Sequence, residues 1–479
     1  MPSRPLLPAF TGRRCGREVV LTNSKLRTVA PKAAGWRDRY AATPEASRPT
    51  DSVKESEPLK GAYFWLTVFY VVYCARPEDW IPGLHSVPLA KISGVFAILG
   101  LLLSVGRSKR GLRDFPREAL YLLLMIGMFF LSAAFSPVWK GGAFFRTLDF
   151  SKVFVAWVLT FLAVTSLARL RRVLFIQAAS VAVISIVSMV KGASHTRLDG
   201  VLGGIYSNPN DLGFAIVLSL PFCLAFLLRT GSILRKSAWT VSLLLMISAL
   251  FLTASRGAFI TFLVSGAVSL WHFGIKGRRV YLIGAALLIA IVVGIAVGGP
   301  LKDRLLAISG DGLDTNSQSS AYGSYEQRRI LISRSLDGIE HYPILGIGLH
   351  NFSTFSGVWR DVHVTYLQIA VEGGIPCLIL YLLFLARGFS NLRALGRFTN
   401  FDPEVKLFAG ALHSSLVGFL VGALFAPEAY QYFPYFAVAY TAVLLAIEQD
   451  AASSRGLNRL QRIAGETRRE RKPSFTYAW

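Results

Sequence analysis

The sequence predicts an all-α polytopic membrane protein, and three observations carry this prediction. Of the 479 residues, 53% are hydrophobic and only 16% are charged, and the mean hydropathy is +0.47. A soluble chain of this length would need more charged surface. Apolar runs close to the bilayer-spanning length of about 20 residues recur along the chain. The formal charge of +23 is concentrated in short connecting segments, a pattern typical of membrane topology and not of nucleic-acid binding.

Twelve apolar segments are expected to be transmembrane helices. The first and the seventh are the shortest, and the seventh and eighth are separated by so few residues that they should form a hairpin. The segments are 60–75, 88–105, 117–135, 150–168, 172–190, 209–228, 238–254, 257–273, 279–298, 366–386, 405–426 and 433–448.

The distribution of basic residues predicts the orientation of these helices. Eighteen Lys and Arg fall in five alternate loops: 106–118, 169–172, 229–237, 274–279 and 387–406. The positive-inside rule places these loops and both termini in the cytoplasm. The long connection 299–365 is then expected on the outer side of the membrane.

The two ends of the chain differ from the membrane domain, which is expected to span 60–448. Residues 1–58 are basic and polar and contain no apolar core of a secretory signal, so we expect a disordered cytoplasmic tail, or translation begun upstream of the true start. Residues 449–479 are expected to form a second basic cytoplasmic tail. Four cysteines without metal-ligand spacing are expected to fill the core and not to form disulfides.

The outer connection 299–365 divides into two parts. Residues 309–326 are rich in Gly, Ser and Asp, which is typical of a flexible lid. Residues 327–343 carry apolar side chains near helical spacing and end at Pro343, which predicts an amphipathic helix at the membrane surface.

Arginines recur at the outer mouths of the expected helices, at Arg76, Arg197, Arg256 and Arg328, with Arg329 beside the last. Guanidinium has the fork geometry and permanent charge that suit a phosphate. Arginine at a membrane boundary also binds lipid headgroups or pairs with neighbouring carboxylates such as Glu78, Asp79 or Asp199. Both interpretations remain open for each arginine.

His363 stands at the start of the tenth segment, three residues before Tyr366, so both would share one helix face. An imidazole at the membrane surface suits a general base, and it also suits an interfacial polar anchor. Spacing alone does not select it over five competing histidines, His85, His195, His341, His350 and His413.

Three further polar positions are candidates for supporting roles. Gln368 and Glu372 are four residues apart and share a face of the tenth segment, where Glu372 precedes the helix-breaking Gly373-Gly374 and Pro376. In "YSNPNDLG", Asn210 or Asp211 is expected to cap the sixth segment. No carboxylate pair has metal-ligand spacing and no nucleotide-binding glycine loop is present, so neither a metal nor another cofactor is expected.

These motifs, taken in order, resemble those of the O-antigen ligase and O-antigen polymerase (Wzy-type) superfamily of bacterial membrane glycosyltransferases. "RRILISRSLDGIEHYPILGIGLHNF" and "HVTYLQIAVEGGIP" are similar to the family's central block, "TASRGAF" to its SRG turn, and "GGIYSNPNDLGFAIVLSLP" to its NPN segment. The "ARPEDW" stretch resembles a subset of the family. Two positions depart from the pattern: Val364 replaces an Asn that follows the histidine, and Ile332 replaces an aromatic residue.

The resemblance implies a GT-C-like membrane fold and the transfer of a glycan from an undecaprenyl-diphosphate carrier. The acceptor would be a hydroxyl of lipid A core or of a protein, on the periplasmic face of the bacterial inner membrane. It implies a general-base role for His363 and diphosphate-binding roles for Arg256 and Arg328, without a metal. The implied partners are the lipid-linked donor, the acceptor and membrane lipids, and not nucleic acid. Three other functions remain open: a Wzy-type polymerase, a secondary transporter of an anionic solute, and an envelope-assembly scaffold.

Overall fold

The computed structural model describes residues 59–470, except for 105, 107–109, 112–113, 193–197, 199–203, 298–314, 359 and 399–401. Contacts divide the chain into two units, Met1–Ser56 and Glu57–Trp479, and every described residue belongs to the second. Cys15 and the lid residues 309–314 lie outside the described residues, as do Arg197, His195 and Asp199.

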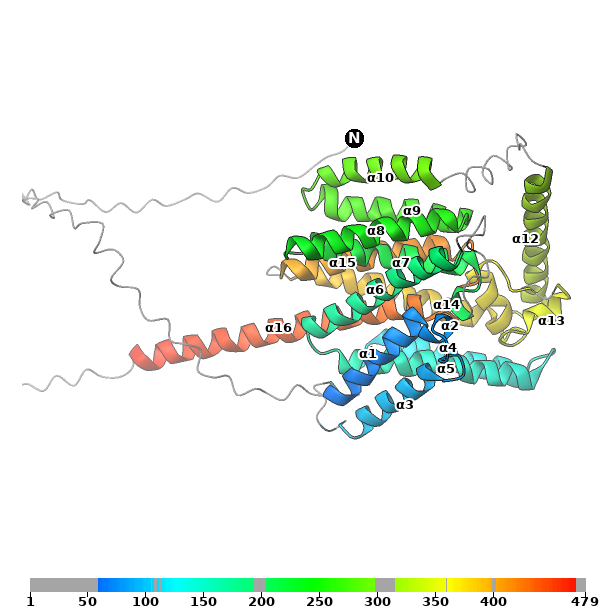
Figure 1. Ribbon diagram of the computed structural model, residues 1–479. Helices are drawn as coiled ribbons and strands as arrows, with labels where there is room; N and C mark the ends of the chain where they lie inside the picture. Colours follow the sequence, from blue (N-terminus) through cyan, green and yellow to red (C-terminus); the bar gives the residue numbers. More distant parts are fainter. Residues whose placement is uncertain are drawn as a thin grey trace, which may run out of the picture. The chain divides into compact units, whose positions relative to one another are not determined.

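The described residues form helices and no strands (Figure 1). The elements in chain order are α1 (Lys60–Ala75), α2 (Pro77–Trp80), α3 (Leu89–Leu102), α4 (Arg117–Ala134), α5 (Lys140–Ala163), α6 (Leu167–Lys191), η3 (Gly204–Tyr206), α7 (Pro209–Leu228), α8 (Ile233–Leu252), α9 (Arg256–Ser269), η4 (Leu270–Ile275), α10 (Tyr281–Val297), α12 (Thr315–His341), α13 (Phe352–Ser356), α14 (Thr365–Leu395), α15 (Pro403–Gly422) and α16 (Tyr432–Glu470).

Each of the twelve predicted segments overlaps one of these helices. Within the described part of the chain, seven helices are long and apolar enough to cross a membrane: α4, α6, α7, α8, α9 continued by η4, α14 and α15. The all-helical, multi-pass membrane character is therefore confirmed. The count of twelve crossings and the inside–outside assignment stay predictions.

Several expected boundaries are wrong by more than a turn, and three of them show the physical reason. The fourth predicted segment, 150–168, is α5, which begins at Lys140 because it continues through the charged residues Arg146, Asp149 and Lys152. The helix expected over 327–343 is α12, which begins at Thr315 and so includes residues assigned to the lid. α16 runs to Glu470, beyond the predicted end at 448, because the polar residues that follow the apolar stretch stay helical. In each case the apolar pattern indicates that a helix is present but does not fix where it begins or ends.

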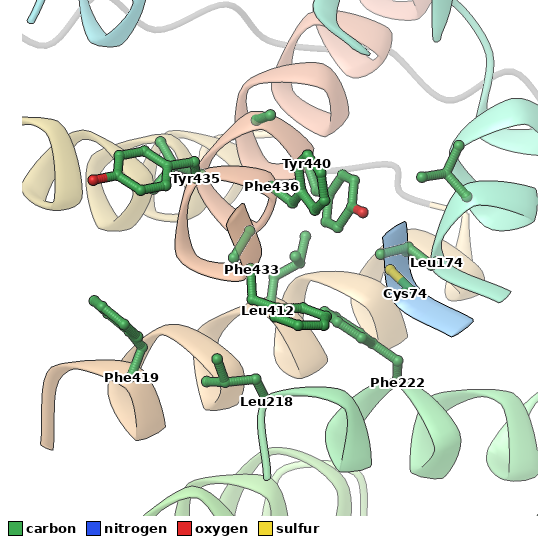
Figure 2. Close-up of a cluster of buried hydrophobic side chains, with 14 of the residues drawn as sticks. Cys74, Leu174, Leu218, Phe222, Leu412, Phe419, Phe433, Tyr435, Phe436 and Tyr440 are labelled. Atoms are coloured by element: carbon green, nitrogen blue, oxygen red, sulfur yellow. The ribbon is translucent and has the colours of Figure 1, made fainter. Parts of the chain in front are cut away.

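α7 is the most buried of the seven candidate spans. It packs against α6, α8, α9 and α15, and Ser415 of α15 donates a hydrogen bond to the Leu218 carbonyl (2.8 Å). The aromatic and aliphatic side chains between α7, α15 and α16 form the core in Figure 2, where Leu218, Phe222, Leu412, Phe419, Phe436 and Tyr440 are labelled. Cys74, Cys223 and Cys377 are buried and unbridged, as expected for core residues.

α14 is broken at Gly374, and this break positions the candidate site. Gly374 has φ 83° and ψ 168°, a conformation essentially restricted to glycine. The N–H of Ile375 is diverted to the Pro343 carbonyl (2.7 Å), and Pro376 has no N–H. The carbonyls of Val371 and Glu372 consequently lose their helical donors.

The segment 343–348 supplies the missing donors. Ile347 N–H bonds to the Val371 carbonyl (2.9 Å) and Gly348 N–H to the Glu372 carbonyl (3.0 Å), which also accepts from Ser132 of α4 (2.7 Å). A Cβ on Gly346 would lie 2.6 Å from the Glu372 carbonyl carbon, so only glycine permits this approach. We call the contact between 343–348 and 371–375 the clasp. It joins the outer connection to the middle of α14.

Candidate functional site

A cavity of about 900 Å³ opens between the N-terminal part of α14, α1, α3, α5 and the loop 423–431. This volume lies within the range of small-molecule sites. Its walls carry four cationic side chains, Arg76, Lys91, Arg146 and Lys152, and two carboxylates, Asp211 and Asp361. Apolar residues such as Val95, Ile98 and Leu159 complete it, so the cavity suits a ligand with an anionic head and an apolar part.

His363 lies beside this cavity, in the loop that leads into α14. Its Nδ1 is 2.9 Å from the backbone carbonyl oxygen of Asp361, and Asp361 lines the cavity. A carbonyl oxygen only accepts hydrogen bonds, so Nδ1 carries the proton and Nε2 of the neutral ring is left as the base. Burial lowers the pKa of His363, and the charges of Arg328 and Arg360 lower it further. His363 is therefore neutral near pH 7.

Arg328 is close enough to His363 for its charge to act on the imidazole. It is partly buried on α12, and the neighbouring Leu331 packs in a small core with Ile347, Phe352, Val362 and Val371. This core holds α12 against the clasp and the start of α14. In Figure 1, α12 stands at the same end of the described helices as α13 and crosses the direction of helices such as α7 and α8.

Arg256 is the first residue of α9, directly after the cap Ser255. The Ser255 hydroxyl accepts from Ala258 N–H and donates to the Asn210 side-chain oxygen (2.6 Å), which ties the SRG turn to the NPN segment. Gly257 approaches Phe425 so closely that a Cβ would lie 2.7 Å from its side chain. The loop containing Phe425 is bonded to Thr365, whose hydroxyl donates to the Ala426 carbonyl (2.7 Å). The backbone at Arg256 is thus fixed next to the loop that packs on the start of α14.

Asn210 does not cap α7, and neither does Asp211. The cap is Asn208, whose side-chain oxygen accepts from Asn210 N–H (3.0 Å), because Pro209 occupies the first helical position. Asp211 points instead to the cavity, where it faces Glu428 of the loop 423–431. Burial, followed by the charge of Asp211, raises the pKa of Glu428 well above its usual range.

The remaining predicted arginines have different surroundings. Arg76 lines the cavity and is also ion-paired with Asp79 and, at 3.8 Å, with Glu78. The expected pairing of Arg76 with neighbouring carboxylates is observed, and its phosphate-binding role stays a prediction. Arg329 is largely exposed, lies 3.8 Å from Glu326 and does not line the cavity.

The three supporting residues on α14 divide into one cavity residue and two packing residues. Gln368 is buried and lines the cavity, and its Oε1 has no hydrogen-bond partner among the described residues. Tyr366 donates to the Leu420 carbonyl (2.8 Å) and so holds α14 on α15. Glu372 is fully buried and accepts a hydrogen bond from Tyr430. A structural role for Glu372 was one of the expected alternatives.

The other described histidines lie apart from His363, with one exception. His350 lines the cavity, and its ring centroid is 4.9 Å from that of Tyr430. Burial lowers the pKa of His350, and the charge of Arg146 lowers it further, while Asp361 raises it. His341 is on the surface at the end of α12, and His413 pairs with His272 elsewhere.

Sequence reasoning missed several cavity residues: Lys91, Arg146, Lys152, Asp211, Asp361 and Tyr430. One local signal was available, because Arg146 and Lys152 are charges within an otherwise apolar stretch and such charges tend to face an aqueous cavity. Lys91 carries the same signal in the apolar segment 88–105, whereas Asp211, Asp361 and Tyr430 come from elements far apart in the chain and have none. Among the described residues, no three His, Cys, Asp or Glu side chains gather as a metal site.

The arrangement combines a cavity with four cationic side chains, the adjacent imidazole of His363, and a buried carboxyl, Glu428, whose pKa is raised. The cations would stabilise negative charge that develops on a phosphate, and His363 Nε2 would accept a proton from a hydroxyl.

Comparison with known proteins identifies the family of this region. Residues 241–382 match the family model described as O-Antigen ligase, and this match contains the SRG turn, α12, the clasp and His363. No curated protein matches the chain. The O-antigen ligase/Wzy resemblance is thereby confirmed for residues 241–382, which are similar to the family described as O-Antigen ligase.

Proposed function

We propose that this multi-pass membrane protein is an O-antigen ligase-like glycosyltransferase that moves a glycan from an undecaprenyl-diphosphate carrier to an acceptor hydroxyl. The family match supports ligase- or polymerase-type function in polysaccharide biosynthesis. The observation that carries the finer proposal is the cavity with four cationic side chains beside the neutral imidazole of His363. A diphosphate leaving group needs the first feature and a hydroxyl nucleophile needs the second.

In the proposed reaction the acceptor oxygen attacks the anomeric carbon of the donor sugar. The hydroxyl proton passes to His363 Nε2 as the new carbon–oxygen bond forms. The bond between the anomeric carbon and the diphosphate oxygen breaks, and the diphosphate leaves with that electron pair. Arg256 and Arg328 act with Arg76 to neutralise it. Stabilisation of this charge is the larger contribution, and base assistance adds about 10²–10⁴-fold.

The cavity favours the lipid-linked donor over a free anionic solute. Its apolar wall is formed by Val95 and Ile98 of α3 together with Leu159 of α5. Two further side chains of α3, Phe96 and Leu99, are exposed to the surrounding medium. A polyprenyl chain would lie along such a surface while its diphosphate reaches the cations. The proposed site opens to the periplasmic face of the inner membrane, as the positive-inside rule predicts.

The test is the glycan pattern of the native host without this gene, complemented with the wild-type chain. Long glycans that accumulate on the polyprenyl carrier, and that reach the acceptor only after complementation, would support a ligase. Acceptors that carry a single repeat would support the Wzy-type polymerase instead. An unchanged pattern would reject both and leave the transporter or the scaffold.

The orientation is tested separately with a membrane-impermeant thiol reagent. Cys74, Cys223 and Cys377 are buried, so a Cys15→Ser background gives single-site reporters. Thr354→Cys lies on the exposed part of α13, near the candidate site, and Ser237→Cys lies near the start of α8 at the opposite end. Labelling of residue 354 but not of residue 237 in intact spheroplasts supports the proposed orientation, and the reverse contradicts it.

A further inference from the structure

A second cavity, of about 830 Å³, lies at the opposite end of two helices that help to form the candidate site. α7 reaches from Asp211 in the first cavity to Leu228 in the second, and α14 reaches from Gln368 to Arg393. Twenty helical residues span about 30 Å, so a ligand in one cavity does not contact the other. The second cavity is also lined by η4, the turn that follows it, and the start of α15.

Cationic side chains predominate around this cavity, with Arg229, Lys276, Arg279, Arg393 and Lys406 against two carboxylates, Asp402 and Glu404. Both carboxylates have structural roles. Asp402 accepts from Glu404 N–H (2.8 Å) and caps α15, and Glu404 bridges Arg229 (2.9 Å) and Arg171 (3.0 Å). The cations therefore exceed what these carboxylates neutralise.

A histidine pair forms the inner wall. His272 Nε2 is 3.1 Å from His413 Nδ1, and the Phe389 ring packs edge-on against His413 with centroids 5.7 Å apart. Gly410 allows this pairing, since a Cβ there would lie 3.2 Å from His272 Cβ. Two neutral histidines that share one N–H···N bond keep one further ring N–H, which can donate to an anionic oxygen.

The mouth of the cavity adjoins side chains typical of a membrane interface. Trp271 and Ile275 on η4 are each 51% exposed, and the Lys276 ammonium lies 5.8 Å from the centre of the Trp271 ring. Exposed Trp next to Lys is the usual composition at headgroup depth. If the basic residues here served only to determine membrane topology, they could lie anywhere on the loops. Instead, five of them surround one cavity.

We propose that this second cavity binds the phosphate group of an anionic membrane lipid. The phosphate lies among Lys276, Arg393 and the histidine pair, and the acyl chains lie along the exposed apolar surface of η4. The same chemistry would accept free phosphate, so the experiment distinguishes the two sources. The inference is independent of the proposed glycosyl transfer.

The test uses the full chain purified in neutral detergent and measures thermal unfolding and, by native mass spectrometry, bound lipid. The additives are phosphatidylglycerol, zwitterionic phosphatidylcholine and inorganic phosphate. Phosphatidylglycerol should bind and raise the unfolding temperature, and phosphatidylcholine should not. Lys276→Gln with Arg393→Gln should weaken the binding by roughly 5-fold for each charge removed.

The matched control is Arg235→Gln with Lys236→Gln, which removes the same charge from exposed positions on α8 outside the cavity. The control should bind phosphatidylglycerol like the wild type. If inorganic phosphate alone reproduces the stabilisation and the cavity variant loses it, the site holds a free phosphate. Equal binding by the cavity and control variants, or no preference for the anionic lipid, would overturn the proposal.

Discussion

The two cavities have similar volumes, about 900 and 830 Å³, but different chemistry and different construction. The first combines four cations with Asp211, Asp361 and a neutral histidine, and it adjoins a break in α14. The second is predominantly cationic and is lined by the ends of α7 and α14, the start of α15, and η4 with the turn that follows it. Anion binding alone needs only the second arrangement. Chemistry on a bound anion also needs a proton acceptor at the reacting atoms, and beside the first cavity His363 is held next to the clasp with its Nε2 available as a base.

The clasp adjoins the first cavity and, among the described residues, has no counterpart at the second. Its substitution Gly374→Ala should therefore have the largest effect on protein stability. A Cβ at this position would lie 2.1 Å from the Ile344 carbonyl oxygen, and the φ of 83° is unfavourable for alanine. We expect a destabilisation of about 3 kcal/mol or more, seen as a loss of monodisperse protein in size-exclusion chromatography. Gly127→Ala on α4 is the control, because nothing lies within 4 Å of its Cβ. Equal behaviour of the two variants would contradict the clasp.

The second-largest predicted effect comes from substituting the arginines assigned to the diphosphate. Arg256→Gln and Arg328→Gln should each lower glycan transfer by about 10²–10³-fold, as loss of one preorganised charge does. Arg334→Gln on the exposed face of α12 should leave transfer unchanged. Thermal unfolding of each variant separates lost chemistry from lost folding. Wild-type transfer by Arg256→Gln and Arg328→Gln would remove these residues from the site.

Much of the fold was predictable, because the length and hydropathy of a membrane helix are local properties. Twelve apolar segments locate twelve helices, yet the start of α5 was missed because Lys140, Arg146 and Lys152 interrupt its apolar pattern. Gly373-Gly374 and Pro376 predicted a break in α14. Their partners were not predictable, since the pairing of Ile347 and Gly348 with Val371 and Glu372 depends on the tertiary fold.

The candidate site was predictable only where a motif marked it. His363, Arg256 and Arg328 stand in family motifs, and the structure places His363 within the influence of Arg328. Asp211 seemed to be a helix cap from its local sequence, and only the packing of the loop 423–431 brings Glu428 to it. His350 appeared secondary beside the "HVTYLQ" histidine, yet it lines the cavity directly.

The raised pKa of Glu428 predicts a pH dependence of stability at the site end. A carboxyl whose pKa is raised by folding binds its proton more tightly in the folded state. Its contribution is complete below the unfolded value of about 4.3 and is lost as the pH rises towards the folded pKa. The unfolding temperature should therefore fall with rising pH above about 4.3, and Glu428→Gln should flatten this slope. An identical slope in the variant would mean that Glu428 is ionised in the folded protein.

The smallest predicted effect concerns Arg360, whose charge lowers the pKa of His363. A base must be unprotonated, so transfer should rise with pH through the pKa of His363. Arg360→Gln should raise that pKa and move the acid limb of the pH–rate profile to higher pH by less than about one unit, because Arg360 is exposed. The maximal rate should not change. A fall in the maximal rate with no shift of the limb would assign Arg360 a different role.

The most direct test of the central claim compares three histidine variants in the host that lacks the gene. His363→Ala removes the proposed base, His350→Ala removes the imidazole inside the cavity, and His341→Ala removes an exposed histidine of α12. With all three present at wild-type levels, glycan transfer should be lost in His363→Ala, reduced less in His350→Ala and normal in His341→Ala. Wild-type transfer by His363→Ala, with transfer abolished in His350→Ala, would contradict the account and move the base into the cavity.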